Sequence, residues 1–518
     1  SAFERELAVH RLTSIAEQMG DALERSAIST NVKERRDYSC GVLDAEGRLV
    51  ASAAHVPVHL GALDACVQRV VDVLGGLRPG DVAITNHPAF GGSHLPDVTI
   101  VQAAFDDRGE RLGYVASRAH HAEIGGSAPG SMPPNATTLD EEGVPIPPTR
   151  LLREGHNGLP NLERLLRSHR FPSRSVDDNI ADVLAAIAAG RGGVRSIERE
   201  AREIGADRMR SAMRWIIEHT ATLVRQAIAA REISSELVIE TMDDGAEIHI
   251  AVRPERDGLM VDLTGTSGVR AGNTNAPLAV TRSAIAYVVR LLLDRPIPIN
   301  AGLLDPIRVL APEGCFVHPR FDPALGSLPA VAGGNVETSQ RIAEGLIRAL
   351  RLAAAGPGTM NNLLLGNEVA SVYETIGGGA GATYGHAGAS GVHTHMTNTA
   401  ITDAEVLEQR HPLRVHRFSL RSDSGGPGRW RGGDGLVREI EALEPLRVTV
   451  LSQRRTHGAP GAVGGGEGST GVHTVLRFEG DEETLDWASG ASLRAGDRVV
   501  MRTPGGGGWG DPASVQSK

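Results

Sequence analysis

The spacing of apolar residues changes along the chain, and these changes limit the folds that it can form. Apolar residues at helical spacing in residues 3–26 predict an amphipathic helix. A helical pattern returns over residues 162–236, in two or three segments. Residues 237–265 instead alternate in the manner of an antiparallel meander with glycine-containing turns. Beyond about residue 360, short strands and glycine turns dominate. A mixed α/β fold of the α+β class is therefore expected.

Four regions follow from these changes. We expect an α/β region over 1–160, a helical segment over 161–236, an α+β region over 237–360, and a glycine-rich, β-rich region over 361–518. Within the first region, residues 38–51 predict a hairpin whose turn is DAEG, with Asp37 at its mouth. Aromatic residues make up only 3% of the chain, which has 63 glycines. The core must therefore rely on Val, Leu, Ile and Ala, with many tight turns.

Histidines and carboxylates gather in residues 86–124, around two strand-like runs. His94 and Asp97 lie three residues apart across a proline, so we expect them on a turn. The apolar run that follows would carry His120 to a strand end, and a β-hairpin brings such positions together. Imidazole and carboxylate ligands suit a catalytic divalent metal, either zinc, manganese or iron, and thiolates of a closed structural site are lacking. The alternative is a turn stabilised by hydrogen bonds alone.

The strings NHPAFGGSHLPDVT and RAHHAEIGGSAPGSMPPNA resemble the signature of the hydantoinase B/oxoprolinase family, whose relatives include metal-binding subunits of acetone- and acetophenone-type carboxylases. The resemblance covers nearly the whole chain. It includes the strings SAISTNVKERRDYSCGVLDAEGRLVA, GNTNAPLAVTRSA, AVAGGNVETSQR and TPGGGGWGDP. So many ordered, unusual strings make a chance match very improbable.

The resemblance implies a metal site and its surroundings, and it makes residues 1–160 a metal-binding region. The ligands of that site would be Asp37, His94, Asp97 and His120. Residues that would orient ligands or transfer protons are His121, Glu123 and His59, of which His121 or Glu123 is the expected catalytic acid/base. The chain departs from the family pattern twice, at His87 in place of an aspartate and at Glu123 in HHAE where most relatives have HHAD.

The resemblance also implies a function and a partner. The chain would be the B subunit of an ATP-dependent hydrolase that opens a cyclic amide such as a hydantoin, 5-oxoproline or a lactam. An A-type subunit would bind ATP with magnesium and phosphorylate the substrate, in an assembly with two copies of each subunit. One alternative is a carboxylase subunit that uses carbon dioxide derived from bicarbonate. A second alternative is a metal-stabilised structural subunit without catalysis of its own.

Charge, cysteine content and hydropathy argue against a nucleic-acid-binding, disulfide-linked or membrane-spanning protein. The formal net charge is -10 and basic residues are dispersed, which argues against nucleic acid as a partner. Cys40, Cys66 and Cys315 are too scattered for a disulfide framework and indicate a reducing compartment. The most apolar stretch, AIAYVVRLLL, is short and interrupted by Arg290, so no membrane segment is expected. With no signal peptide recognised, we expect a cytoplasmic protein.

Three further features have competing interpretations. The glycine-rich residues 377–385 lack the spacing of a phosphate-binding loop, so we expect tight backbone turns there, with nucleotide contact as the weaker alternative. Cys40 is expected to be a buried small hydrophobe rather than a nucleophile. His393 and His395 would share one face if they lay on a strand, where they could bind a metal, meet substrate, or face solvent or a subunit interface.

Overall fold

The computed structural model describes residues 2–53, 55–322, 324, 326–367 and 371–515. Its N-terminal part is built on a seven-stranded antiparallel sheet with the order β2-β1-β5-β4-β3-β6-β7. The strands are β1 (Tyr38–Leu43), β2 (Leu49–Ser52), β3 (Val82–Thr85), β4 (Asp97–Phe105), β5 (Arg111–His120), β6 (Thr149–Arg153) and β7 (His156–Asn157). The predicted hairpin of residues 38–51 is the β1–β2 pair.

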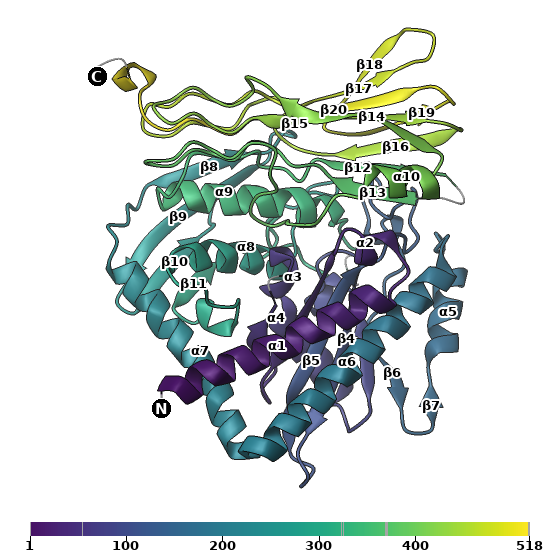
Figure 1. Cartoon of the computed structure of the whole chain (residues 1–518), viewed down its shortest axis with the longest axis vertical. Coiled ribbons are helices and arrows are strands. Elements are labelled where there is room, and N and C mark those ends of the chain that lie inside the picture. Colours follow the sequence, from purple (N-terminus) through teal and green to yellow (C-terminus); the bar gives the residue numbers. More distant parts are fainter. Residues whose placement is uncertain (1, 54, 323, 325, 368–370, 516–518) are drawn as a thin grey trace.

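Helices cover both faces of this sheet. Two long helices, α1 (Ala2–Ser26) and α6 (Val176–Ile204), lie side by side in Figure 1 and contact β1, β2, β4 and β5. On α1 the predicted apolar positions Leu12, Ile15, Met19 and Leu23 are buried. The opposite face packs on α4 (Leu63–Leu74). The remaining helical elements of this part are α2 (Thr30–Lys33), α3 (Pro57–Leu60), α5 (Leu159–Ser168), α7 (Ala206–Ala229), η1 (Pro88–Phe90) and η2 (Leu139–Glu141). Alternate residues of β4 thus enter different cores, and both faces of the sheet are buried.

The central part has a second sheet with the order β11-β10-β9-β8. Its strands are β8 (Leu237–Thr241), β9 (Glu247–Glu255), β10 (Gly258–Asp262) and β11 (Ile307–Leu310), and its helical elements are α8 (Leu278–Leu291), η3 (Ala301–Leu303) and α9 (Ser339–Ala349). The first three strands form the predicted antiparallel meander, whereas β11 pairs with β10 in parallel. A π-helical turn, Gly334–Thr338, leads directly into α9. The α-helix itself therefore begins at Ser339.

Two antiparallel sheets form the C-terminal part, at one end of the molecule in Figure 1. The elements are β12 (Asn362–Gly366), β13 (Ser371–Thr375), α10 (Ala404–Arg410), β14 (Leu413–Arg421), β15 (Gly435–Ala442), β16 (Leu446–Leu451), β17 (Val472–Leu476), β18 (Glu482–Leu485), β19 (Ala488–Leu493), β20 (Arg498–Arg502) and η6 (Pro512–Val515). The sheet orders are β13-β12-β16-β19 and β14-β15-β20-β17-β18, with an aliphatic core between them. The expected α+β class, with a β-rich C-terminal part, is confirmed.

Glycines in the C-terminal loops allow backbones to pack against each other. A Cβ on Gly379 would lie 1.9 Å from the carbonyl oxygen of Gly433, and one on Gly381 would lie 2.0 Å from that of Ala354. Both belong to the glycine-rich residues 377–385, which are thus occupied with neighbouring backbone. None of the helices in the described residues is long and apolar enough to cross a membrane.

Candidate metal centre

The hairpin of β4 and β5 places Asp97 directly opposite His120. Asp97 is the first residue of β4, His120 is the last residue of β5, and the two are paired in register. His94 lies in the turn before β4, where its carbonyl accepts the backbone N–H of Asp97 at 3.1 Å. The structure therefore brings together three of the four residues that the sequence suggested as ligands, and it does so through local hairpin geometry.

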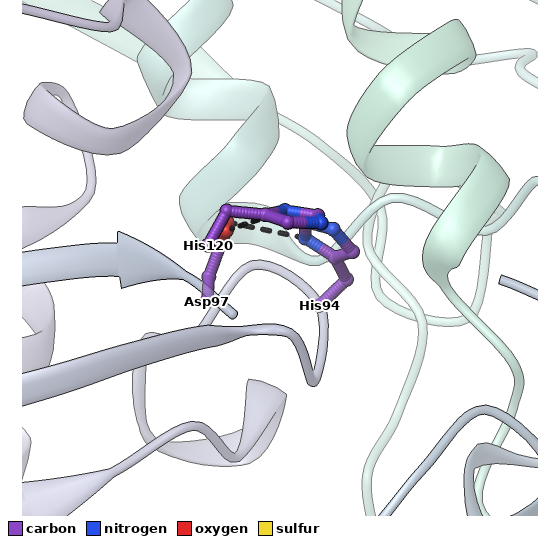
Figure 2. A group of neighbouring side chains, drawn as sticks. All are labelled: His94, Asp97 and His120. Atoms are coloured by element: carbon purple, nitrogen blue, oxygen red, sulfur yellow. Dashed lines mark ion pairs between the residues drawn. The ribbon is translucent and has the colours of Figure 1, made fainter. Parts of the chain in front are cut away.

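The three side chains point toward one another and are buried (Figure 2). Nδ1 of His94 lies 3.1 Å from one Asp97 oxygen, and Nδ1 of His120 lies 3.2 Å from the other. One ligand atom from each residue falls within 4.8 Å of the others. The Ser93 hydroxyl also donates to Asp97 and limits how its carboxylate can rotate.

His59 and Asp37 border this cluster. His59, on the short helix α3, has its Nε2 3.3 Å from an Asp97 oxygen and 3.9 Å from an Asp37 oxygen. Asp37 precedes β1, and its other oxygen lies 3.5 Å from the guanidinium of Arg35. His59 thus contacts two expected ligands directly, which is closer than the supporting position expected from the sequence. Asp37 lines the same cavity as the cluster but lies outside the tight group of three.

Electrostatics favour an anionic Asp97 and a neutral His120. Burial by itself would raise the pKa of the Asp97 carboxyl, but His94, His59 and His120 outweigh it and hold that pKa well below its usual range. Burial lowers the pKa of His120, and the neighbouring Asp97 carboxylate only partly offsets this effect. An anionic Asp97 beside a neutral His120 suits metal binding, because metal ligands must be deprotonated.

The donor set fits a divalent metal ion. Within the part of the chain that the structure describes, four buried atoms of the cluster have no hydrogen-bond partner: Nδ1 and Nε2 of His94, Nε2 of His120 and Oδ1 of Asp97. Buried polar atoms without partners are costly, and an ion bound by nitrogen and oxygen ligands would remove that cost. Two imidazoles with one or two carboxylates suit zinc, manganese or iron.

Residues from the distant part of the sequence complete a small cavity around the cluster. The cavity encloses about 20 Å³, which is room for about one water molecule. Its walls beyond the N-terminal part are Asn335, Val336, Met360, Tyr373, Thr375, Met396 and Thr397. The Tyr373 ring stacks on His120 with centroids 5.0 Å apart. The Arg35 guanidinium lies 4.2 Å from the centroid of the same tyrosine ring. The strings GGNVETSQ and SVYETI contain Asn335, Val336, Tyr373 and Thr375, but the sequence did not predict that these residues lie near the metal cluster.

His121 and Glu123 point to other partners. His121 Nδ1 lies 3.1 Å from the side-chain nitrogen of Asn179 on α6. Glu123 accepts hydrogen bonds from the backbone of Gly125 and Gly130, and it pairs with Arg174 at 3.2 Å. Burial raises the pKa of Glu123 against the opposing effect of these partners. The Glu123 carboxylate therefore contacts the loop that follows it and Arg174, and its role as an acid/base stays a prediction.

His393, His395 and His87 contact neighbouring backbone or side chains. His393 and His395 are in a loop rather than on a strand, so the expected common face is wrong. His393 contacts the carbonyl of Thr375, whereas His395, with φ at 56°, approaches Glu344 at 3.5 Å. Burial raises the pKa of the Cys40 thiol far above its usual range, which makes the thiol unreactive. His87 accepts the backbone N–H of Ala89 and caps η1.

The chain is similar to known proteins over nearly its whole length. The sequence model of the family described as "Hydantoinase B/oxoprolinase" matches residues 1–512. The chain is 41% identical to 5-oxoprolinase 1 of Arabidopsis thaliana over 97% of its own length and 41% of that protein. It spans about two fifths of the length of the 5-oxoprolinases that it matches.

Two solved structures share the fold. One is an ATP-dependent caprolactamase from Pseudomonas jessenii, with a TM-score of 0.85, 23% identity, and coverage of 99% of this chain and 91% of that one. The other is an acetone carboxylase, with a TM-score of 0.85, 17% identity, and coverage of 99% and 76%. The fold is therefore shared by proteins that perform different reactions, and only the site can distinguish between them.

Proposed function

The chain belongs to the hydantoinase B/oxoprolinase family, and on that premise we propose that it is the metal-binding, ring-opening part of an ATP-dependent cyclic amide hydrolase. Its substrate would be a hydantoin, 5-oxoproline or another lactam, activated by phosphorylation elsewhere in the assembly. The observation that carries this proposal is the buried cluster of His94, Asp97 and His120, whose unpartnered nitrogen and oxygen atoms lie beside a small cavity.

The residues of this chain would bind the metal ion and move a proton. His94, Asp97 and His120 would hold a divalent ion, with Asp37 as the fourth ligand at the edge of the cavity. The ion would act as a Lewis acid and would lower the pKa of a water bound to it, so that hydroxide is supplied at neutral pH. His59 contacts both carboxylates and is the best-placed group to orient them or to carry a proton.

Activation by ATP would take place outside this chain. The sequence has no phosphate-binding loop, and the glycines of residues 377–385 are packed against neighbouring backbone. We therefore assign ATP and magnesium to an A-type part, either a separate subunit in an assembly with two copies of each or the remainder of a longer chain. The shares of the curated relatives that the chain covers are compatible with both arrangements.

A reconstitution experiment tests this division. The purified chain alone is expected to give a flat calorimetric titration with ATP and to open no ring. Addition of an A-type partner, ATP and a divalent metal should restore opening of at least one of 5-oxoproline, hydantoin and ε-caprolactam. Micromolar ATP binding by the chain alone, or turnover without the partner, would contradict the proposal.

The acetone carboxylase fold gives the second candidate function, a carboxylase that joins an activated substrate to carbon dioxide. Incorporation of labelled bicarbonate into product, with no ring opening, would favour it. A third arrangement, a structural subunit whose metal only stabilises the fold, predicts unchanged turnover after His94→Ala if the assembly stays intact. The hydrolase predicts loss of turnover from the same intact assembly.

A further inference from the structure

Asn335 lines the cavity from a part of the fold that does not contribute to the metal cluster. It belongs to the π-helical turn Gly334–Thr338, and its side chain is buried with 2% exposure. Within the described chain its Oδ1 atom has no hydrogen-bond donor. A buried amide oxygen without a donor is costly, so this atom is suited to receive a donor from a molecule that enters the cavity.

Other polar side chains on the same walls already have partners. The Tyr373 hydroxyl donates to Asn362 at 2.8 Å. The Thr375 hydroxyl lies 2.8 Å from that of Thr399 and accepts from Arg35. Val336, Met360 and Met396 are apolar. Because the cavity has room for about one water-sized group, only the edge of a ligand, such as one N–H group, would reach the Asn335 amide.

The turn holds Asn335 rigidly. The Ser339 N–H donates to the Gly334 carbonyl, which inserts an extra residue before α9. The Thr338 hydroxyl donates to the carbonyl of Thr274 at 2.6 Å, and the Gly334 N–H donates to that of Asn273 at 2.8 Å. A Cβ on Gly334 would lie 1.8 Å from the carbonyl oxygen of Asn275, so the turn depends on close backbone contact. The amide is thus positioned before a ligand arrives.

We propose that Asn335 is a substrate-binding residue whose Oδ1 accepts a hydrogen bond from the ring nitrogen of the cyclic amide. This inference rests on the proposed function. An amide phosphorylated on its oxygen keeps its N–H as the protonated imidate, and this N–H lies next to the carbon that is attacked. An acceptor beside the metal cluster would hold that protonated form and fix which face of the carbon turns toward the cluster. It would also hold the nitrogen as the ring opens, and removing it would impair ring opening more than activation by ATP.

The test measures ring opening and ATP hydrolysis separately in the complex with its A-type partner. The probes are 5-oxoproline, hydantoin and ε-caprolactam. Asn335→Ala is expected to lower the rate of ring opening by about 10- to 100-fold. ATP hydrolysis should fall much less, so more ATP is consumed for each ring opened. Asn335→Asp retains an acceptor and should recover part of the loss.

Asn273→Ala is the matched control. Asn273 packs against the same turn through Gly333 and donates to Pro133, but it does not line the cavity. Its replacement should lower the melting temperature and leave the ratio of ATP consumed to rings opened at the wild-type value. An unchanged ratio in Asn335→Ala would overturn the inference. If the wild-type complex opens none of the three rings while it hydrolyses ATP, the proposed function fails and this inference falls with it.

Discussion

At the scale of single residues, the site depends on the carboxylate of Asp97, which several side chains contact at once. Asp97 contacts His94, His120, His59 and Ser93 within a fully buried space. These contacts orient the carboxylate even without an ion, because His59 and His94 contact one of its oxygens and His120 contacts the other. The cluster is therefore a preformed ligand set, and its loss should be visible both in metal content and in stability.

His120→Ala should remove the metal and the stability that the metal confers. An ion that binds only the folded state at 100 times its dissociation constant adds about 2.7 kcal/mol to the free energy of unfolding. Elemental analysis and thermal melts with and without chelator measure the effect: the chelator should lower the melting temperature of the wild type but not of the variant. His393→Ala is the control and should keep its metal. Full metal occupancy in His120→Ala would contradict the ligand assignment.

Glu123→Gln should destabilise the fold rather than stop the chemistry. The amide would place an N–H2 group against the Gly125 or Gly130 backbone donor and leave Arg174 without its anion. A cost of about 1–3 kcal/mol in the free energy of unfolding is expected, with the metal retained. Urea denaturation and elemental analysis check this. A rate lowered by about 10²- to 10⁴-fold at unchanged stability would instead restore the proton-transfer role.

At the scale of elements, the packing of α6 against α1 and the sheet depends on where its glycines lie. Gly193 faces inward, and a Cβ there would lie 2.4 Å from the sulfur of Met19. The adjacent Gly192 has no heavy atom of the described residues within 4 Å of such a Cβ. Neighbouring positions on one helix thus differ because only one of them faces the contact with α1.

Substitution of these two glycines should change stability in opposite directions. Gly192→Ala should raise the free energy of unfolding by about 0.5–1 kcal/mol, because alanine loses less conformational entropy in a helix. Gly193→Ala should lower it by about 1–3 kcal/mol, because overpacking displaces buried side chains. Thermal and urea denaturation of the two variants provide the comparison. Equal stabilisation by both would show that α1 and α6 are not packed as described.

At the scale of the whole molecule, the cavity exists only because distant parts of the chain meet. Asp37, His59, His94 and His120 come from the N-terminal part, whereas Asn335 and Tyr373 come from the central and C-terminal parts. Glu142 helps to join them: its two oxygens accept the backbone N–H groups of Val331 and Ala332, each at 2.8 Å. These two residues lead into the π-helical turn that carries Asn335.

Glu142 should make stability depend on pH. Burial raises its pKa from 4.5 to about 8, partly opposed by the two backbone donors. Because the folded-state pKa is the higher one, its contribution is fully present below about 4.5 and is lost as pH rises through about 8. The slope should approach about 1.4 kcal/mol per pH unit between these values. Urea denaturation from pH 5 to 9 on the wild type and Glu142→Gln tests this. Glu337, whose pKa burial also raises to about 8, remains in both. Equal pH slopes would contradict the prediction.

The sequence by itself determined the features that depend on local order. Helical and alternating periods predicted α1, the meander of β8 to β10 and the β-rich C-terminal part, since side-chain periodicity follows from backbone geometry. The proximity of Asp97 and His120 was predictable for the same reason. They flank one hairpin, and the register of a hairpin follows from its own strands.

Only the tertiary structure decided which distant residues surround that hairpin end. His59 entered the cluster because α3 packs there, and Tyr373 and Asn335 reached the cavity from elements more than 200 positions away in the sequence. Arg174 drew the Glu123 carboxylate away from the site, and a loop replaced the strand expected for His393 and His395. No local period encodes such contacts, because they arise when separately formed elements bury their apolar faces against each other.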